Sequence, residues 1–292
     1  MRKLMFILNP KASGFNKFDY KKQIEKYLKE KNINFDYEIK TTTYPKEAIE
    51  ISKNAIKDGF NELIAVGGDG TINEVGDIAR KNNLKLGIIP AGTGNDYCNS
   101  LKKSTNFNDC MDKINIGNYR EVDYGLFLDK TFFNVLSVGF DAEVNRLALK
   151  IKKYIKNSLS YKLAIVLALI KYKRKRYKII VDNKEYTDDF FLIAIGIGGK
   201  YGGNINILPK AEIDDGLFDV CMIKYKSKFN IIKKVKTIID ASHIKEDITL
   251  YKKAKSVTII TDNLEINYDG EYMKTCGKIE FTVGEGKMKI LL

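Results

Sequence analysis

The stretch Leu63-Ile64-Ala65-Val66-Gly67-Gly68-Asp69-Gly70-Thr71-Ile72-Asn73-Glu74 decides the expected fold. Its four leading apolar residues form a continuous run, which is typical of a strand buried on both faces of a parallel sheet. Three glycines around one acid follow at once, and a helical pattern begins at Ile72. Glycine permits a tight turn and lets backbone N–H groups approach phosphate oxygens closely. The stretch therefore predicts a strand, a phosphate-binding turn and a helix.

The start of the predicted helix gives a second reason to expect an anion at this turn. A helix N-terminus carries a positive dipole end and N–H groups without intrahelical acceptors. Thr71 is placed to cap the helix, and Asp69 is placed to hold a magnesium ion through water. The alternative is an ordinary strand–turn–helix loop in which Asp69 is a turn residue.

Two further loops follow strand-like runs in the same way. Ile88-Ile89-Pro90 leads through Ala91 into Gly92-Thr93-Gly94-Asn95-Asp96, and the apolar run 4–8 leads into Asn9-Pro10-Lys11-Ala12-Ser13-Gly14. Ligands of open α/β sheets bind beyond the carboxyl ends of the strands, so the three loops are expected to face one phosphate-bearing ligand. The 9–14 loop alone could equally be a plain turn. The common nucleotide motifs do not explain the pattern, because there is no GxxxxGK[ST] and 196–201 departs from GxGxxG at its last residue.

Outward from these loops, residues 1–123 alternate between strand and helix patterns. This alternation predicts a doubly wound α/β domain with a parallel sheet. The expected strands are 4–8, 35–39, 63–66 and 86–89, and the expected helices are 19–31, 45–56 and 72–80.

After Asp123 the rhythm changes, because strand-like runs follow one another and helical runs are few. This pattern predicts a C-terminal, mainly antiparallel β domain over 124–283, and the last residues, 284–292, are expected to pack back on the first domain. The expected strands are 132–138, 177–182, 190–196, 217–223, 256–260, 264–268 and 278–283. The expected helices are 141–171 and 228–240.

The composition describes a globular chain with an uneven charge. Of 292 residues, 44% are apolar and 30% charged, and the net charge is +13, of which 126–292 carry +10. The longest fully apolar run is Leu163–Ile170, which is too short to span a bilayer. The four cysteines contain no CxxC pair and are expected to be reduced cytosolic thiols.

The densest positive charge lies in Lys150–Lys178, which has 11 Lys and Arg residues and no acid around the apolar run 163–170. An amphipathic helix at the surface of anionic lipid is one interpretation. A core helix with solvated lysines at its ends is the other.

Together these motifs resemble the diacylglycerol kinase catalytic-domain family, in particular the soluble bacterial lipid kinases. The resemblance extends to 209–217 and to Tyr268-Asp269-Gly270-Glu271. It implies an N-terminal domain of the NAD kinase/diacylglycerol kinase kind that binds ATP, and a C-terminal domain that binds the lipid. The residues implied to contact ATP are Asn9, Pro10, Ser13, Gly14, Thr42 (or Thr43), Gly67, Gly68, Asp69, Gly70, Thr71, Asn73 and Thr93.

The resemblance also implies catalytic and metal-binding residues. The matched catalytic acids are Glu271, Asp269, Asp96 and Asp123. Either Glu271 or Asp269 is taken as the base that accepts the lipid hydroxyl proton, while Asp69, Asp96 and Asp123 match a water and magnesium network. The matched ligands of a structural magnesium ion are the Asp215 carboxylate and the backbone carbonyls of Glu212 and Leu217. The alternative for 269–271 is a hairpin turn and for 214–216 another turn.

The expected function is transfer of the γ-phosphoryl group of ATP to a lipid hydroxyl, with diacylglycerol as the default acceptor, phosphatidic acid as the product and Mg2+ as the cofactor. A sphingoid base, ceramide or other lipid alcohol stays open, as does a soluble acceptor such as NAD. A nucleic-acid binder is disfavoured because no recognisable motif accompanies the charge, and a silent nucleotide sensor because all the candidate acids are present. We expect a cytoplasmic protein bound peripherally to anionic lipid at the inner face of the cell membrane. The oligomeric state is open, with a homodimer as one alternative.

Overall fold

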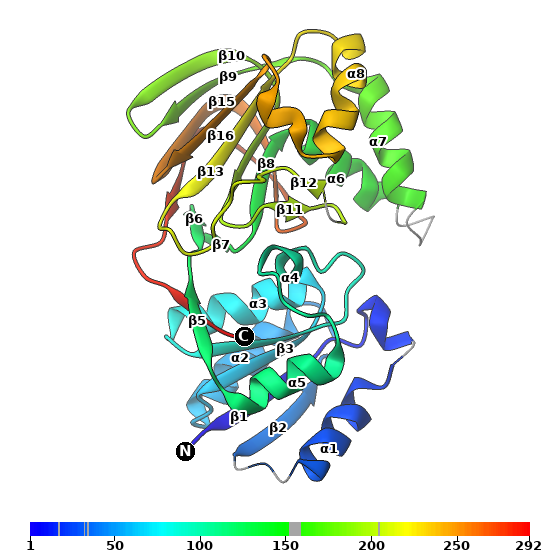
Figure 1. Ribbon diagram of the computed structural model, residues 1–292, viewed down its shortest axis with the longest axis vertical. Coiled ribbons are helices and arrows are strands. Elements are labelled where there is room, and N and C mark those ends of the chain that lie inside the picture. The colour runs from blue at the N-terminus through cyan, green and yellow to red at the C-terminus, as the bar shows by residue number, and fades with distance from the viewer. Residues whose placement is uncertain (17, 32, 34, 152–158, 204) are drawn as a thin grey trace. The chain divides into compact units, whose positions relative to one another are not determined.

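The computed structural model describes residues 1–16, 18–31, 33, 35–151, 159–203 and 205–292. These residues form two compact units (Figure 1). The N-terminal unit comprises Met1–Asp123 and Glu285–Leu292, and the C-terminal unit comprises Tyr124–Gly284.

The N-terminal unit is built on a six-stranded sheet. In spatial order its strands are β2 (Asp36–Thr41), β1 (Lys3–Leu8), β3 (Glu62–Gly67), β4 (Lys85–Pro90), β17 (Met288–Leu291) and β5 (Tyr119–Val122). All neighbours are parallel except β17 and β5. The predicted parallel α/β domain is therefore confirmed.

Helices cover both faces of this sheet because the side chains of each strand alternate between the faces. The helices are α1 (Tyr20–Glu30), α2 (Glu47–Lys57), α3 (Asp69–Lys81), α4 (Asp96–Ser100) and α5 (Phe107–Ile116), with a short 3-10 turn, η1 (Ser13–Asn16). Phe6 and Ile64 share a buried cluster with Ile24 of α1 and Ile114 of α5. Helices α2 and α3 contact each other and the strands β1, β3 and β4.

Two helix starts in this unit differ from the prediction. Helix α3 begins at Asp69 instead of Ile72, so Asp69 and Gly70 belong to its first turn. Helix α2 begins at Glu47, because Lys46 adopts a left-handed conformation with φ of 68° and Pro45 lies in the preceding turn. Glu47 accepts hydrogen bonds from the Thr43 and Tyr44 N–H groups and so stabilises this start.

The C-terminal unit is an antiparallel nine-stranded sheet, as predicted. Its strands run in the order β14 (Thr249–Ala254), β13 (Phe218–Lys224), β10 (Lys184–Gly196), β8 (Val135–Gly139), β15 (Ser256–Tyr268), β16 (Glu271–Val283), β6 (Gly125–Phe127) and β7 (Lys130–Phe132). Strand β9 (Lys175–Val181) pairs with β10 and β15, and β11 (Lys200–Tyr201) with β12 (Ile205–Asn206) forms a separate ribbon.

Several of these strands are longer than predicted. The predicted strands 256–260 and 264–268 are one strand, β15, with a register irregularity between Thr261 and Leu264. Strand β16 begins at Glu271 instead of residue 278, because an antiparallel strand can keep one polar face in water. Residues 261–263 and 271–277 were therefore left outside the predicted strands, although the chain continues as strand through both.

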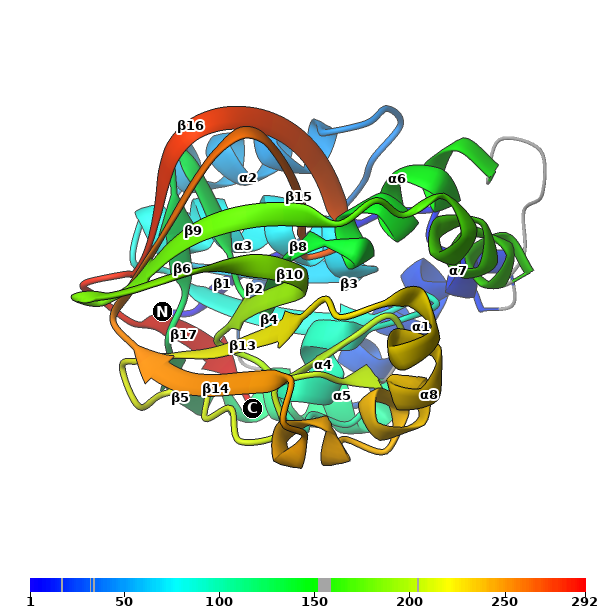
Figure 2. The same cartoon turned by 90° about the horizontal axis from the view of Figure 1, so that it is seen from above.

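The predicted helix 141–171 is two helices, α6 (Phe140–Ile151) and α7 (Leu159–Lys171), which contact each other (Figure 2). Ala164 and Ala168 of α7 pack against Val144 of α6. Residues 152–158 of this prediction lie outside the described residues. Helix α8 (Lys228–Ile239) and a 3-10 turn, η2 (Ser242–Lys245), complete the unit. No helix in the described chain has the length and apolar character needed to cross a bilayer.

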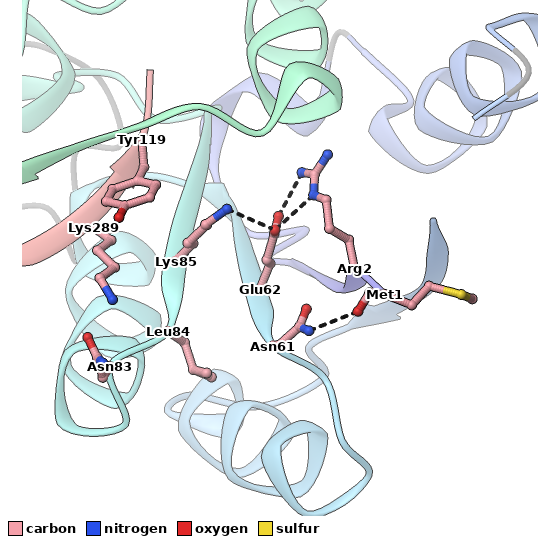
Figure 3. A pocket seen from close by; sticks show the side chains of 9 residues that line it. All are labelled: Met1, Arg2, Asn61, Glu62, Asn83, Leu84, Lys85, Tyr119 and Lys289. Carbon is pink, nitrogen blue, oxygen red and sulfur yellow. Dashed lines mark hydrogen bonds and ion pairs between the residues drawn. The ribbon is translucent and has the colours of Figure 1, made fainter. Parts of the chain in front are cut away.

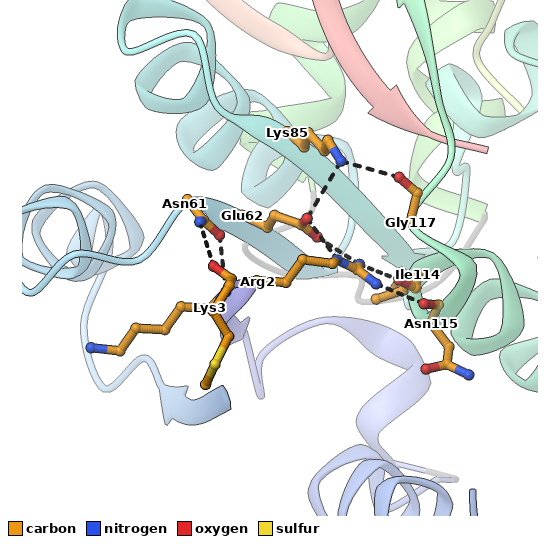
Figure 4. Close-up of polar contacts among 9 residues, drawn as sticks. Arg2, Lys3, Asn61, Glu62, Lys85, Ile114, Asn115 and Gly117 are labelled. Atoms are coloured by element: carbon orange, nitrogen blue, oxygen red, sulfur yellow. Dashed lines mark hydrogen bonds and ion pairs between the residues drawn. The ribbon is translucent and has the colours of Figure 1, made fainter. Parts of the chain in front are cut away.

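At the amino ends of β1, β3 and β4, a buried carboxylate holds several segments together (Figures 3 and 4). The Glu62 side chain is 3% exposed and receives two hydrogen bonds from the Arg2 guanidinium, at 2.7 and 2.8 Å. Lys85 Nζ lies 3.6 Å from the same carboxylate. Arg2 also donates to the carbonyl oxygens of Ile114 and Asn115 at the end of α5.

We predict that Arg2→Ala lowers the free energy of unfolding by about 3 kcal/mol, because it removes the bidentate partner of a buried carboxylate. Urea denaturation of the purified variant measures this loss. Lys22→Ala is the matched control: Lys22 is 82% exposed, its ion pair with Asp19 spans 3.5 Å, and its removal should change stability by less than about 0.5 kcal/mol. Equal denaturation midpoints for the two variants would contradict the assignment.

Candidate functional site

Three loops meet at the carboxyl ends of β1, β3 and β4. Backbone hydrogen bonds join them: Asn9 N–H donates to Val66 O at 2.9 Å, Gly14 N–H to Ala91 O at 2.8 Å, and Ala91 N–H to Gly67 O at 2.7 Å. The loops therefore hold fixed positions relative to one another.

Glycines let two of these loops touch backbone to backbone. A Cβ atom on Gly92 would lie 2.7 Å from Gly68 Cα, and one on Gly67 would lie 2.5 Å from Thr71 Oγ1. In contrast, a Cβ on Gly70 would have no neighbour within 4 Å. The glycines thus differ in their surroundings: Gly67 and Gly92 permit close packing, whereas Gly70 faces open space.

The start of α3 lies among these loops. Its first intrahelical bond runs from Ile72 N–H to Gly68 O, so the N–H groups of Asp69, Gly70 and Thr71 have no acceptor within the helix. Gly68 precedes the helix and provides no side-chain cap. The positive end of the helix dipole adds to these donors, and the arrangement suits an anion such as a phosphate.

Side-chain contacts connect the predicted ATP residues across the loops. Asn9 Nδ2 donates to Thr71 Oγ1 at 3.0 Å, and Ser13 Oγ lies 2.9 Å from Thr93 Oγ1. Thr71 is therefore a buried acceptor inside the first turn, and the prediction that it caps the helix is wrong. Thr42 is buried beside the end of β1, where its N–H donates to Leu8 O, whereas Thr43 is exposed. Pro10 is exposed in the first loop, and Asn73 is partly buried in the first turn of α3.

Two of the predicted acids lie close together. A Cβ on Gly94 would be 3.2 Å from Asp96 Oδ2 and 3.6 Å from Asp69 Oδ2. Asp69 Oδ1 also accepts the Tyr97 N–H at 3.1 Å. Burial and, to a lesser extent, the Asp69 charge raise the pKa of the Cys98 thiol to about 12, so this neighbour stays a neutral thiol.

The third acid, Asp123, has a different environment. It is 1% exposed and forms an ion pair with Lys287, on the segment that leads to β17. A single sequence offers no signal for this pair, because 164 positions separate the two residues.

In the C-terminal unit, Asp269 and Glu271 lie at the turn between β15 and β16. Asp269 adopts a left-handed conformation with φ of 47°, and its carboxylate accepts the N–H groups of Phe133 and Asn134 at 2.7 and 3.0 Å. Glu271 is exposed and accepts the Tyr268 hydroxyl at 3.2 Å. Burial, followed by the charge of Glu271, raises the pKa of Tyr268, which therefore stays a donor. Asp269 is thus an anchor of the turn, and Glu271 is the more available carboxylate.

A buried polar network behind this turn was missed by sequence reasoning. Asn145 Nδ2 donates to Gly270 O at 3.0 Å and to Asn267 Oδ1 at 2.7 Å. Asn267 donates in turn to Asp141, which also accepts the Ser137 hydroxyl. Burial raises the pKa of Asp141. Through this network, residues of β8 and α6, which are distant in sequence, hold the backbone of the 269–271 turn in place.

Comparisons with known proteins agree with these features. The model of the diacylglycerol kinase catalytic domain matches residues 3–127, and that of the YegS C-terminal NAD kinase beta sandwich-like domain matches 134–291. The chain belongs to the diacylglycerol kinase catalytic-domain family. The resemblance drawn from the glycine loops is confirmed, and so is the kinase class.

Relatives in this kinase family match along nearly their whole length. A diacylglycerol kinase of Staphylococcus carnosus (strain TM300) is 29% identical, over 93% of this chain and 90% of that protein. One from Bacillus subtilis (strain 168) is 27% identical, with 93% and 90% covered. A solved candidate diacylglycerol kinase from Bacillus anthracis has a TM-score of 0.81 at 25% identity, over 99% and 97%. An NAD kinase from Archaeoglobus fulgidus shares the fold alone, with a TM-score of 0.53 at 14% identity, over 100% and 94%.

At the loop predicted to bind a structural magnesium ion, a lysine side chain contacts the carboxylate that was expected to bind the metal. Asp215 Oδ2 accepts Lys253 Nζ at 2.5 Å, and Asp215 Oδ1 accepts the Leu217 N–H at 3.0 Å. Lys253 also lies 3.3 Å from Asp219, the residue opposite it in the β13–β14 pair. Glu212 is exposed, and no cluster of three or more metal-ligating side chains occurs among the described residues. A magnesium ion at Asp215 would therefore displace the Lys253 ammonium.

We predict opposite effects on stability for alanine at two glycines of these loops. Gly92→Ala should lower the free energy of unfolding by about 1–3 kcal/mol, because the new Cβ would collide with Gly68. Gly70→Ala should be neutral or stabilising by up to about 1 kcal/mol, because its Cβ meets open space within a helix. Thermal and urea denaturation without nucleotide check both values, and a Gly92→Ala variant as stable as wild type would refute the close contact.

Proposed function

We propose that this chain transfers the γ-phosphoryl group of ATP to the hydroxyl of a lipid, with diacylglycerol as the acceptor and phosphatidic acid as the product. The observation that carries the proposal is the meeting of three loops, two of them rich in glycine, at the start of α3, beside open space at Gly70. The relatives named diacylglycerol kinase support the lipid acceptor.

We assign the ATP phosphates to the loops of the N-terminal unit. The N–H groups of the first turn of α3 supply donors, and Ser13 and Thr93 add hydroxyls that lie 2.9 Å apart. The archaeal NAD kinase of the same fold was solved in complex with ATP, so a protein of this fold binds that nucleotide. Phosphoryl transfer depends mainly on positioning and charge neutralisation, and rigid backbone donors supply the first.

We assign the base to Glu271. In the proposed step the lipid hydroxyl oxygen bonds to the γ-phosphorus, the bond from that phosphorus to the β–γ bridging oxygen breaks, and the hydroxyl proton passes to the Glu271 carboxylate. ADP leaves with the bridging oxygen. Glu271 is preferred over Asp269 because both Asp269 oxygens already accept backbone N–H groups. The hydrogen bonds of Asp269 position the turn that carries Glu271.

Magnesium, when bound, would neutralise phosphate charge, and Asp69 and Asp96 are the acids we assign to it because their carboxylates share the surroundings of Gly94. The Lys287 ammonium already neutralises the Asp123 carboxylate, so we assign Asp123 a supporting role. A structural ion at Asp215 remains part of the proposal, in competition with Lys253.

The test is incubation of the purified protein with labelled ATP and a panel of acceptors, followed by chromatography. The panel contains diacylglycerol, a sphingoid base, ceramide and NAD. We expect labelled phosphatidic acid from diacylglycerol and at least tenfold less label in the other products. Label in NADP alone would contradict the lipid kinase proposal and indicate a kinase of a soluble acceptor. Label in a sphingoid or ceramide phosphate alone would show that the lipid acceptor is not diacylglycerol.

We predict that Glu271→Gln reduces kcat about a hundredfold or more, with the KM for ATP and the melting temperature nearly unchanged. Asp269→Asn should lower the melting temperature as well, because it weakens the acceptor of two backbone N–H groups. Steady-state kinetics and thermal unfolding of both variants separate a base from an anchor. Wild-type turnover by a folded Glu271→Gln variant would rule out Glu271 as the base.

A further inference from the structure

Helix α7 exposes large apolar side chains and buries small ones. Ala164 and Ala168 are fully buried, whereas Leu163, Val166 and Ile170 are 38%, 52% and 64% exposed. The spacing of the exposed residues, i, i+3 and i+7, places them on one face. Helices on the surface of a globular domain usually show the opposite arrangement, with the large apolar residues turned inward.

Helix α8 carries a second set of exposed apolar side chains. Phe229, Ile232 and Ile239 are 68%, 56% and 65% exposed, and they share a helical face, while Ile231 is buried. Lys228 Nζ donates to Ile170 O at 2.5 Å, which brings the start of α8 to the end of α7. Figures 1 and 2 both show the two helices as neighbours. We call these exposed residues the α7–α8 face: Leu163, Val166, Ile170, Phe229, Ile232 and Ile239.

Lysines outnumber acids beside the apolar residues of this face, where the exposed Asp240 follows Ile239 at the end of α8. Helices α7 and α8 contain no Asp or Glu, and Lys171, Lys228, Lys233 and Lys236 are exposed on them. The acids that follow α8 have other contacts. Asp240 accepts hydrogen bonds from Ser242, and Glu246 and Asp247 form ion pairs with Lys234 and Lys226.

Several basic side chains of the stretch 150–178 are paired with acids, so this stretch offers less positive charge to a partner than its composition suggests. Lys175 pairs with Glu265 and Lys178 with Glu185, each at 2.8 Å, and Arg174 lies 3.8 Å from Asp189. Lys152, Lys153 and Lys156 lie outside the described residues. The sequence prediction of a membrane-binding segment was limited to 150–178, so it did not include the exposed lysines of α8, Lys228, Lys233 and Lys236.

We infer that the α7–α8 face docks onto an anionic phospholipid bilayer. Its apolar side chains enter the headgroup boundary, and its lysines contact lipid phosphates. Charge favours this occupant over a second copy of the chain, because a self-complementary interface would bring two lysine-rich pairs of helices together, and neither α7 nor α8 contains an acid to pair with the lysines. The inference rests on the proposed lipid substrate, and it specifies where the enzyme contacts the membrane that contains it.

The first experiment measures co-sedimentation with vesicles of phosphatidylglycerol and phosphatidylcholine, and with vesicles of phosphatidylcholine alone. We expect binding to the mixed vesicles only, weakened by salt. The triple variant Val166→Ser, Ile170→Ser, Phe229→Ser should bind about tenfold or more weakly, as should Lys228→Gln with Lys233→Gln and Lys236→Gln. Ile116→Ser is the matched control, because Ile116 of α5 is 62% exposed but lies in the N-terminal unit.

The second experiment uses the fact that the chain has no tryptophan. Phe229→Trp places a single tryptophan fluorophore on the face, and Ile116→Trp places one on the control position. Mixed vesicles should shift the emission of Phe229→Trp to shorter wavelength and leave that of Ile116→Trp unchanged, because only the first residue enters the lipid.

Three outcomes would overturn the inference. These are equal binding of the triple variant and wild type, no emission shift for Phe229→Trp, or conversion of a wild-type dimer into a monomer by the triple variant with unaltered vesicle binding. Short-chain, water-soluble diacylglycerol separates the inference from the proposed function. The triple variant should phosphorylate it at the wild-type rate. Vesicle binding by a wild-type protein that transfers phosphate to no lipid would support the docking face and contradict the proposed lipid kinase function.

Discussion

The contact between the backbones of Gly68 and Gly92 is the constraint on which the candidate site depends. A Cβ atom at Gly92 would lie 2.7 Å from Gly68 Cα, so the segments that follow β3 and β4 are too close together for a side chain at Gly92. This contact places the start of α3 beside the 91–96 loop, where Asp69 reaches the Tyr97 N–H and lies near Gly94. The hydrogen bonds of Asn9 and Gly14 then add the loop after β1. Rigid backbone donors of this kind need little reorganisation when an anion binds.

The N-terminal unit could be predicted from sequence because its signals are local. Strands buried on both faces read as continuous apolar runs, and β1, β3 and β4 each match such a run to within about two residues. The glycines that follow β3 and β4 indicated the family and, with it, the fold. The start of α3 was the main error there, since Asp69 and Gly70 were read as turn residues although both are helical.

The C-terminal unit was harder to predict because its determinants are distant in sequence. Exposed polar residues interrupt β15 near its register irregularity, and most of the first half of β16 is exposed, so neither strand reads as a continuous apolar run. The pairing of Lys253 with Asp219 follows from the β13–β14 register, and the Asn145–Asn267–Asp141 network joins α6 to β15. No pattern in a single sequence reports such contacts. The sequence located the Asp269–Glu271 turn, but only the hydrogen bonds distinguish the anchor from the available carboxylate.

Strand β17 has a consequence for how the protein is made. It lies between β4 and β5, and its residues Ile290 and Leu291 are fully buried, yet it follows the entire C-terminal unit in the chain. A nascent chain that has only its first 123 residues outside the ribosome leaves the β4 edge without its partner. The six-stranded sheet can be completed only after the β-rich unit has been synthesised. Translation order therefore delays folding of the complete N-terminal unit until the C-terminal unit has been made.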